Sequence, residues 1–302
     1  MANITAQMVK ELREKTSAGM LDCKKALTET DGDMEAAVTW LRKRGIAKAE
    51  KKASAVAAEG LCSFAVAGNK VVLFELNSQT DFVAQNAKFI DLLTKVGQII
   101  VASNATNTEE ALEVVSDGKK LSEVILEASG VIGEKISLRR VTVLTKTDSQ
   151  VFGCYKHMGG RIVTVSVLNG TDEVAAKDVA MHVAALNPKY VSKDDIPAEV
   201  IASERDVILQ AALNENAKAA KPKPENIIAE RIVPGRLEKN LKEICLLSQQ
   251  FVKNPDQTVE AYVKGAKSEV VTFIRLEVGE GIEKHEVDFA AEVAAQVNSA
   301  NK

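Results

Sequence analysis

This sequence has few of the residues that build metal centres, disulfide frameworks and membrane spans. Its 302 residues include only three histidines, and its four cysteines lack the paired spacing of metal ligands: Cys23, Cys62, Cys154 and Cys245. Aromatic residues make up only 4% of the chain, which disfavours a large all-β core. No apolar run approaches the length of a membrane span, and the N-terminus lacks the apolar stretch of a signal peptide. We therefore expect a cytoplasmic protein with no metal site and no membrane contact.

The rest of the composition is typical of a soluble globular protein. Hydrophobic residues make up 46% of the chain and charged residues 27%. A chain of 302 residues is long enough for about two domains with smaller modules. The net charge is -3, so bulk electrostatic attraction to nucleic acid is not expected.

The most informative stretch covers residues 71–86. Residues 71–76 form a dense apolar run with β-branched residues, which predicts a short buried strand. Polar residues 77–80 are typical of a turn, and Thr80 or Asp81 is placed to cap a helix from Phe82 to about Ala102. The pattern predicts a strand, a tight turn and a helix, with a carboxylate and a large aromatic ring at the tip.

Phe82 has two interpretations, as a core residue or as an exposed contact. A phenylalanine at the start of a helix is more often buried. However, residues 162–175 repeat the pattern of residues 71–84 at an offset of 91 residues, which places Glu173 at the position of Phe82. A position that takes glutamate in the sister copy is expected to face water. An exposed ring beside a carboxylate is typical of an interface anchor, and this is the interpretation we prefer.

Residues 1–46 contain three short segments with helical apolar spacing, and glycine-containing turns separate them. They predict a three-helix bundle, similar to a ubiquitin-associated (UBA) module, whose third helix ends before Gly45. Met20 and Leu21 follow the flexible Gly19, and they are either core residues or side chains that project toward a partner. Residues 47–59 are rich in alanine and lysine and predict a linker, helical or disordered.

Two related α/β subdomains with antiparallel sheets are expected at residues 60–145 and 146–278, which makes the fold class α+β. Each shows the pattern of a β-hairpin, a helix, an excursion and a strand. The second excursion, at about 197–246, contains two helical segments around a Lys-Pro-Lys-Pro break, which predicts an inserted helical hairpin, or coiled coil. Pro234 is expected to kink or interrupt its second arm. Residues 279–302 predict a C-terminal module with an amphipathic helix after Asp288.

Several short motifs occur in one order along the chain. They are LREKT at 12–16, GMLDCKKAL at 19–27, TDFVA at 80–84, IGE at 132–134 and GEGIEK at 279–284. Together they resemble the elongation factor Ts family of bacterial translation, and the resemblance covers essentially the whole chain. Each motif alone is a weak signal, whereas their combination is very specific.

The resemblance implies a guanine-nucleotide exchange factor that binds elongation factor Tu in its GDP-bound and nucleotide-free forms. It implies that Thr80, Asp81, Phe82 and Val83 disturb the partner's magnesium site, with Phe82 wedged between partner helices. It also implies partner contacts from three other places: from Ile132, Gly133 and His157, from Met20 and Leu21 of the bundle, and from Phe289 and Val293 of the C-terminal helix. The helical hairpin matches a coiled-coil module that is often linked to self-association, so a homodimer through this hairpin is a further hypothesis.

Two other classes of protein compete with this interpretation. A metabolic α/β enzyme would use His157 and Asp81 as acid and base in a concave pocket. A ribosome-associated RNA-binding scaffold would use a short set of basic residues, which the negative net charge opposes: Lys48, Lys51, Lys52, Arg139 and Arg140. The chain has no Walker-type phosphate loop and no supported Ser–His–Asp set, so we expect no enzyme, no cofactor and no direct contact with nucleic acid.

Overall fold

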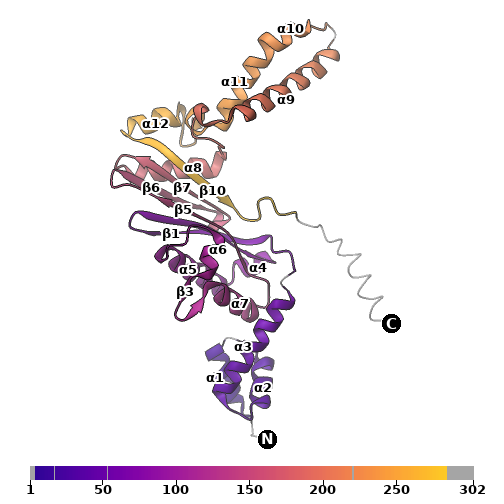
Figure 1. Cartoon of the computed structure of the whole chain (residues 1–302), viewed down its shortest axis with the longest axis vertical. Coiled ribbons are helices and arrows are strands. Elements are labelled where there is room, and N and C mark those ends of the chain that lie inside the picture. Colours follow the sequence, from indigo (N-terminus) through magenta and orange to yellow (C-terminus); the bar gives the residue numbers. More distant parts are fainter. Residues whose placement is uncertain (1–3, 17, 53, 220, 284–302) are drawn as a thin grey trace. The chain divides into compact units, whose positions relative to one another are not determined.

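The computed structural model describes residues 4–283 apart from residues 17, 53 and 220. The chain divides into two compact units. Unit 1 combines Met1–Leu61, Glu75–Val141 and Val278–Lys302, and unit 2 combines Cys62–Phe74 with Thr142–Glu277. Helices and antiparallel strands occur in both units, so the predicted α+β class is confirmed (Figure 1).

Three helices at the start of unit 1 form the predicted bundle: α1 (Ala6–Thr16), α2 (Met20–Glu29) and α3 (Met34–Lys51). Gly32 makes the turn between α2 and α3 with a φ of 85°, a value that glycine adopts without strain. The Asp33 side chain then caps α3 by accepting a hydrogen bond from the Ala36 backbone N–H at 2.9 Å. The buried faces of the three helices meet in one cluster: Val9, Leu12, Cys23, Ala26, Leu27 and Ala37.

The third helix is longer than the sequence predicts. α3 continues through Gly45 to Lys51, so the predicted helix end before Gly45 is wrong and residues 47–51 are helical. Glycine inside a helix costs about 1 kcal/mol relative to alanine, which is why it usually indicates a helix end. Here Gly45 meets Gly130 of α7 (Leu121–Ile132), where a Cβ atom on Gly130 would lie 2.6 Å from the Gly45 carbonyl oxygen. The glycine therefore permits a close helix crossing instead of ending the helix.

Two three-stranded sheets share one topology. The first has the order β1-β2-β5, from β1 (Glu59–Ala67), β2 (Lys70–Ser78) and β5 (Ser137–Thr145). The second has the order β10-β7-β6, from β6 (Gln150–His157), β7 (Ile162–Asn169) and β10 (Glu269–Glu277). In each sheet the last strand pairs with the second strand of a hairpin, so β2 and β7 are central and almost entirely buried. The predicted internal repeat is confirmed.

The helical segment of unit 1 that follows β2 differs from the prediction. Instead of one helix from Phe82, the structure has the short α4 (Asp81–Ala84) and then α5 (Ala87–Ala102). Asn86 separates them because its side chain caps α5, accepting a hydrogen bond from the Lys88 backbone N–H at 2.9 Å. After α6 (Thr108–Glu113), β3 (Val115–Ser116) and β4 (Lys119–Lys120), α7 runs through Gly130. The helix ends at Gly133, which has a φ of 88°.

In unit 2, α8 (Glu173–Leu186) packs closely on strands β6 and β7. Gly153 of β6 makes this possible, because a Cβ atom there would lie 2.0 Å from the Ala176 carbonyl oxygen. Two strand hydroxyls also bond to the helix: Ser166 donates to the Ala176 carbonyl and Thr164 donates to the Ala180 carbonyl, each at 2.7 Å. The core beneath extends to residues near β8 (Gln250–Phe251), β9 (Asn254–Thr258) and α12 (Val259–Gly265), chiefly Leu168, Val179, Val183, Leu246, Phe251, Val259 and Val263.

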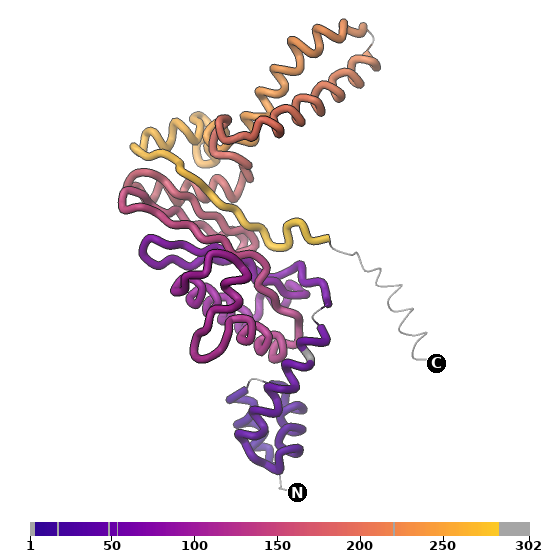
Figure 2. The backbone as a smooth tube through the Cα atoms, viewed as in Figure 1, coloured from indigo at the N-terminus to yellow at the C-terminus, as the bar shows by residue number. Residues whose placement is uncertain are grey.

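The predicted helical hairpin is present in unit 2. Its first arm is α9 (Ala198–Ala217), and its second arm consists of α10 (Glu225–Ile227), a π-helical turn (Ile228–Ile232) and α11 (Val233–Ile244). Figure 2 shows the two arms running side by side. Pro234 has no backbone N–H and lies in the first turn of α11, directly after the π-helical turn. The arm is therefore not interrupted at Pro234, because residues 225–244 are helical throughout, and the departure from α-helical hydrogen bonding is the π-helical turn just before it.

Candidate functional site

The Asp81–Phe82 tip follows the end of the central strand β2. Thr80 is the N-cap of α4, and its hydroxyl accepts a hydrogen bond from the Val83 backbone N–H at 3.4 Å. Ala84 turns inward and is buried, whereas the Phe82 side chain is 81% exposed. The ring therefore projects from a short helical turn, and the prediction of an exposed Phe82 is confirmed.

A second element holds the backbone just before this tip. Glu134 lies directly after Gly133, the residue that ends α7. Its Oε2 atom accepts hydrogen bonds from the backbone N–H groups of Gln79 and Thr80 at 3.1 and 3.0 Å. Its Oε1 atom accepts a hydrogen bond from the Thr80 hydroxyl at 2.7 Å. The fold thus joins two of the sequence motifs, TDFVA and IGE, through Glu134, which is not among the predicted contact residues.

The segment that carries Glu134 is itself anchored to the region after the bundle. The Lys52 ammonium donates a hydrogen bond to the Gly133 carbonyl. The Lys135 ammonium donates to the Ala55 carbonyl at 2.9 Å. The residues on either side of Glu134 are therefore tied to the segment that follows α3, which is continuous with the three-helix bundle.

Met20 and Leu21 form an exposed apolar pair at the start of α2. Their side chains are 58% and 84% exposed, so the interpretation of them as core residues is wrong. The core face of α2 uses Cys23, Ala26 and Leu27 instead. Exposed apolar side chains next to each other are typical of interaction surfaces.

His157 lies in unit 2, as the last residue of β6, and is exposed. The Tyr155 hydroxyl lies 3.4 Å from its Nδ1 atom. The next residue, Met158, is 66% exposed and has a φ of 48°, which is uncommon for a side chain of this size. Met158 is not among the predicted contact residues. Its signal was an apolar residue followed by two glycines at the tip of a predicted hairpin.

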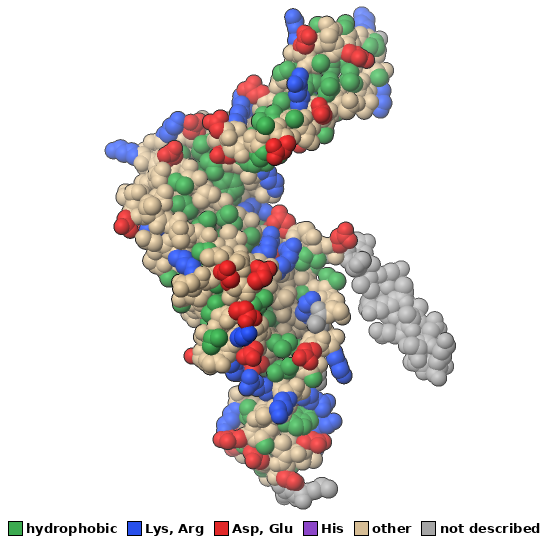
Figure 3. Space-filling model, viewed as in Figure 1, with side chains coloured by type: hydrophobic (Ala, Val, Ile, Leu, Met, Phe, Trp, Pro, Cys, Tyr) green, Lys and Arg blue, Asp and Glu red, His purple; other side chains and the backbone are tan. Residues whose placement is uncertain are grey.

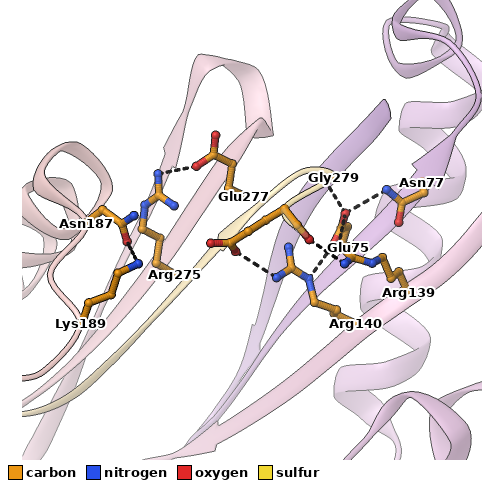
Figure 4. A network of polar contacts seen from close by, with 10 residues as sticks. Glu75, Asn77, Arg139, Arg140, Asn187, Lys189, Arg275, Glu277 and Gly279 are labelled. Carbon is orange, nitrogen blue, oxygen red and sulfur yellow. Dashed lines mark hydrogen bonds and ion pairs between the residues drawn. The ribbon is translucent and has the colours of Figure 1, made fainter. Parts of the chain in front are cut away.

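The predicted contacts Phe289 and Val293 lie outside the described residues. The last described residues of unit 1 end near a buried carboxylate in β2 (Figure 4). Glu75 is fully buried and accepts hydrogen bonds from the Arg139 guanidinium at 3.0 Å and from the Gly279 backbone N–H at 2.8 Å. Arg140 forms a further ion pair with the Glu75 carboxylate. Glu75 stands inside an otherwise apolar run, and this could have indicated a buried ion pair.

The geometry of this tip does not match an enzyme's active site. A ring that is 81% exposed does not line an enclosed pocket. A cavity of about 280 Å³ lies where α3 meets α7, and neither Asp81 nor Phe82 lines it.

Among the described residues, no group of three or more histidine, cysteine, aspartate or glutamate side chains is placed to hold a metal ion. Within the same part of the chain, no helix has both the length and the apolarity of a membrane span.

The charged surface gives little support to an RNA-binding scaffold. Figure 3 shows acidic and basic side chains interspersed on the visible face, without a continuous basic area. Arg139 and Arg140, which the scaffold hypothesis would use, are committed to the buried Glu75. The net charge of -3 agrees with this picture.

Comparison with known proteins gives two similarities. Residues 79–280 match the profile of the family described as "Elongation factor TS". The chain is also 55% identical, over 296 residues, to the elongation factor Ts of Acholeplasma laidlawii (strain PG-8A). That alignment covers 98% of this chain and 99% of the relative, so the similarity extends along both proteins.

Proposed function

This chain belongs to the elongation factor Ts family, and we propose that it binds elongation factor Tu and promotes release of GDP. It acts in the cytoplasm on the GDP-bound and nucleotide-free partner, and it makes and breaks no covalent bond. The exposed Phe82 ring beside Asp81 is the observation that supports this proposal most strongly.

The free energy with which the partner holds its nucleotide determines what an exchange factor has to weaken. A nucleotide bound at nanomolar affinity is held by about 12 kcal/mol, and its phosphates depend on a magnesium ion and on backbone donors. Binding couplings are reciprocal, so a factor that prefers the empty partner weakens nucleotide binding by the same factor. The contacts made by this chain therefore have to displace groups that hold the magnesium ion and the phosphates.

The tip of unit 1 has the chemistry for this task. Phe82 offers a rigid apolar wedge, because an aromatic ring has few rotatable bonds and loses little entropy when it enters a pocket. Asp81 lies beside it and brings a negative charge toward the region of the magnesium ion and the phosphates. We propose that Phe82 separates partner helices while Asp81 disturbs the magnesium site, with Thr80 and Val83 completing the contact.

Other predicted residues add separate contacts with the partner. Ile132 and Gly133 at the end of α7 contact the partner near the Phe82 tip, and His157 contributes a contact from unit 2. Met20 and Leu21 bind the partner's GTP-binding domain from the bundle. The C-terminal module supplies Phe289 and Val293. This distribution links several modest contacts into one tight complex.

Stopped-flow release of a fluorescent GDP from elongation factor Tu tests the proposal. We expect Phe82→Ala to slow release at least about tenfold, because truncating a central aromatic anchor typically costs 2 kcal/mol or more. Val115→Ala is a matched control, because Val115 is also exposed and lies in unit 1. An unchanged release rate for Phe82→Ala, with the fold intact, would remove Phe82 from the mechanism.

The helical hairpin is proposed as a surface for self-association. Its apolar contacts form two clusters. The distal one contains Ile208, Ala212, Ile228 and Val233, and the proximal one contains Ile196, Leu241 and Cys245. Replacing residues 208–233 by a short glycine-serine turn removes the distal cluster and keeps the proximal one. If this replacement leaves the mass measured by light scattering unchanged, self-association does not use the distal hairpin.

A further inference from the structure

We infer that Glu134 is a positioning residue that sets the direction in which the Phe82 ring projects. The inference deepens the proposed function and rests on it, because it assumes that the Phe82 tip is the working surface. It is carried by three hydrogen bonds between Glu134 and the two residues that precede Asp81.

Both carboxylate oxygens of Glu134 are used. One oxygen accepts from two successive backbone N–H groups, of Gln79 at 3.1 Å and of Thr80 at 3.0 Å. The other accepts from the Thr80 hydroxyl at 2.7 Å. Hydrogen bonds to an ionised acceptor are about twice as strong as neutral ones, and two adjacent donors fix the peptide plane between them. The backbone entering α4 is therefore held from outside its own segment.

The Thr80 hydroxyl carries this constraint into α4. Since its proton is donated to Glu134, its oxygen lone pairs are left to accept from the Val83 backbone N–H at 3.4 Å. The hydroxyl thus has one orientation that satisfies both contacts. Phe82 lies between Thr80 and Val83, so the position of its Cα atom follows from this arrangement.

The local sequence supplies only short-range contacts to this turn, the Thr80 cap and a hydrogen bond from the Ser78 hydroxyl to the Thr80 carbonyl at 2.9 Å. α4 has four residues, far fewer than an isolated helix needs to be stable in water. The Phe82 side chain is 81% exposed, so its own packing contributes little to fixing the turn. A mobile tip would lose conformational entropy each time it entered a partner, which lowers affinity and slows exchange.

The segment that carries Glu134 is itself held by several hydrogen bonds. The Gly133 backbone N–H donates to the Ser129 carbonyl at 2.8 Å and closes the end of α7. Gly133 has a φ of 88°, which turns the chain so that Glu134 leaves the helix axis. The Lys52 ammonium donates to the Gly133 carbonyl on one side of Glu134, and the Lys135 ammonium on the other side donates to the Ala55 carbonyl, so this junction is tied to the segment after α3. Glu134 therefore transmits the position of α7 and α3 to the Phe82 tip.

The matched control is a similar glutamate elsewhere in unit 1. Glu110 of α6 accepts hydrogen bonds from the Thr106 backbone N–H and the Thr106 hydroxyl, each at 2.8 Å. Glu110→Ala removes a comparable loop-to-glutamate contact far along the sequence from Phe82. Glu134→Gln is the conservative variant. Its amide oxygen can accept from both backbone N–H groups while its NH₂ group donates to the Thr80 hydroxyl.

The first measurement needs no partner. In a Trp40→Phe background, Phe82→Trp makes the tip the only tryptophan, and time-resolved fluorescence anisotropy reports its local motion on the nanosecond scale. We expect Glu134→Ala to increase this motion clearly, Glu134→Gln to restore most of the order, and Glu110→Ala to change nothing. Equal motion in the Glu134→Ala and Glu110→Ala proteins would overturn the inference, whatever Phe82 does to the partner.

The second measurement is GDP release from elongation factor Tu. We expect Glu134→Ala to slow release about tenfold, which corresponds to losing one charge-assisted contact. In a double-mutant cycle, Phe82→Ala with Glu134→Ala should be no slower than Phe82→Ala alone, because Glu134 acts through Phe82. Additive losses would mean that Glu134 contacts the partner directly and would overturn the inference. If Phe82→Ala alone has no effect, the proposed function of the tip fails, and the anisotropy still decides whether Glu134 orders it.

Discussion

Gly45 of α3 and Gly130 of α7 touch backbone to backbone. A Cβ atom on Gly130 would lie 2.6 Å from both the carbonyl carbon and the carbonyl oxygen of Gly45. Two ion pairs lie near this crossing, since Arg42 of α3 and Lys119 each contact the Glu127 carboxylate of α7. Two glycines inside helices cost about 1 kcal/mol each, so the close approach has to compensate for them. Through this crossing, the three-helix bundle that carries Met20 and Leu21 packs against α7. Gly133 ends α7, and the residue after it is Glu134, which supports the Phe82 tip.

We predict that Gly130→Ala destabilises unit 1. The new methyl group has no room at the crossing and forces the helices apart, and overpacking of this kind typically costs about 1–3 kcal/mol. Gly235→Ala is the control, because Gly235 is also helical but nothing lies within 4 Å of its Cβ position. Urea unfolding should show a loss for Gly130→Ala and no loss for Gly235→Ala. Equal stabilities would mean that the crossing tolerates a side chain.

Glu75 provides a second prediction about stability. Glu75→Ala leaves Arg139 and Arg140 without their shared partner and removes the acceptor of the Gly279 backbone N–H. Breaking a buried ion pair by removing one member typically costs about 3–5 kcal/mol. The control is Glu280→Ala, because Glu280 pairs with Arg140 at 3.2 Å but is partly exposed and should contribute at most about 1 kcal/mol. If both variants lose a comparable free energy of unfolding in urea, the buried Glu75 carboxylate stabilises the fold no more than the exposed Glu280 does.

His182 gives unit 2 a dependence on pH. The side chain is fully buried, and burial lowers the pKa of His182, while its hydrogen bond with Gln249 acts in the opposite direction. Nδ1 accepts from the Val252 backbone N–H at 3.1 Å, so the Nε2 proton is donated to Gln249 at 2.8 Å. A lowered folded-state pKa means that the unfolded chain binds the proton first on acidification.

The stability that His182 contributes is therefore complete above the unfolded-state pKa of about 6.5 and is lost as the pH falls below it. Thermal unfolding between pH 5 and pH 8 should show this acid slope. His182→Gln should flatten the slope, whereas His157→Gln should keep it, because His157 is exposed. If the His182→Gln protein still loses stability as the pH falls, other titratable groups cause the acid slope.

Asp81 is predicted to contribute less to exchange than Phe82. Thr80 provides the N-cap of α4, so replacing Asp81 leaves that cap in place and tests the charge itself. We expect Asp81→Ala and Asp81→Asn to slow GDP release modestly, by less than Phe82→Ala, because a carboxylate near the magnesium site acts only through its field. The measurement is stopped-flow release at several magnesium concentrations. If the release rate is unchanged at every magnesium concentration, Asp81 has no part in exchange and is only a residue of the first turn of α4.

Much of the fold could be predicted because its signals are local. The apolar run at 71–76, the turn before Phe82 and the offset repeat at residue 162 predicted a buried strand with an exposed ring after it. Helical spacing and glycine turns predicted the bundle, and the Lys-Pro-Lys-Pro break between two helical segments predicted the helical hairpin. Apolar periodicity, helix caps and proline act over a few residues, so the local sequence is enough to predict their effects.

Tertiary structure alone decided how these pieces support one another. Glu134 bonds to Thr80 across 54 residues, Arg139 bonds to Glu75 across 64, and Gly45 meets Gly130 although both look like helix ends. A carboxylate that ties down a loop has the same sequence signature as one that faces water. A glycine at a helix crossing likewise looks the same as one that ends a helix. The difference lies in which surfaces meet, and that depends on packing between elements far apart in the chain.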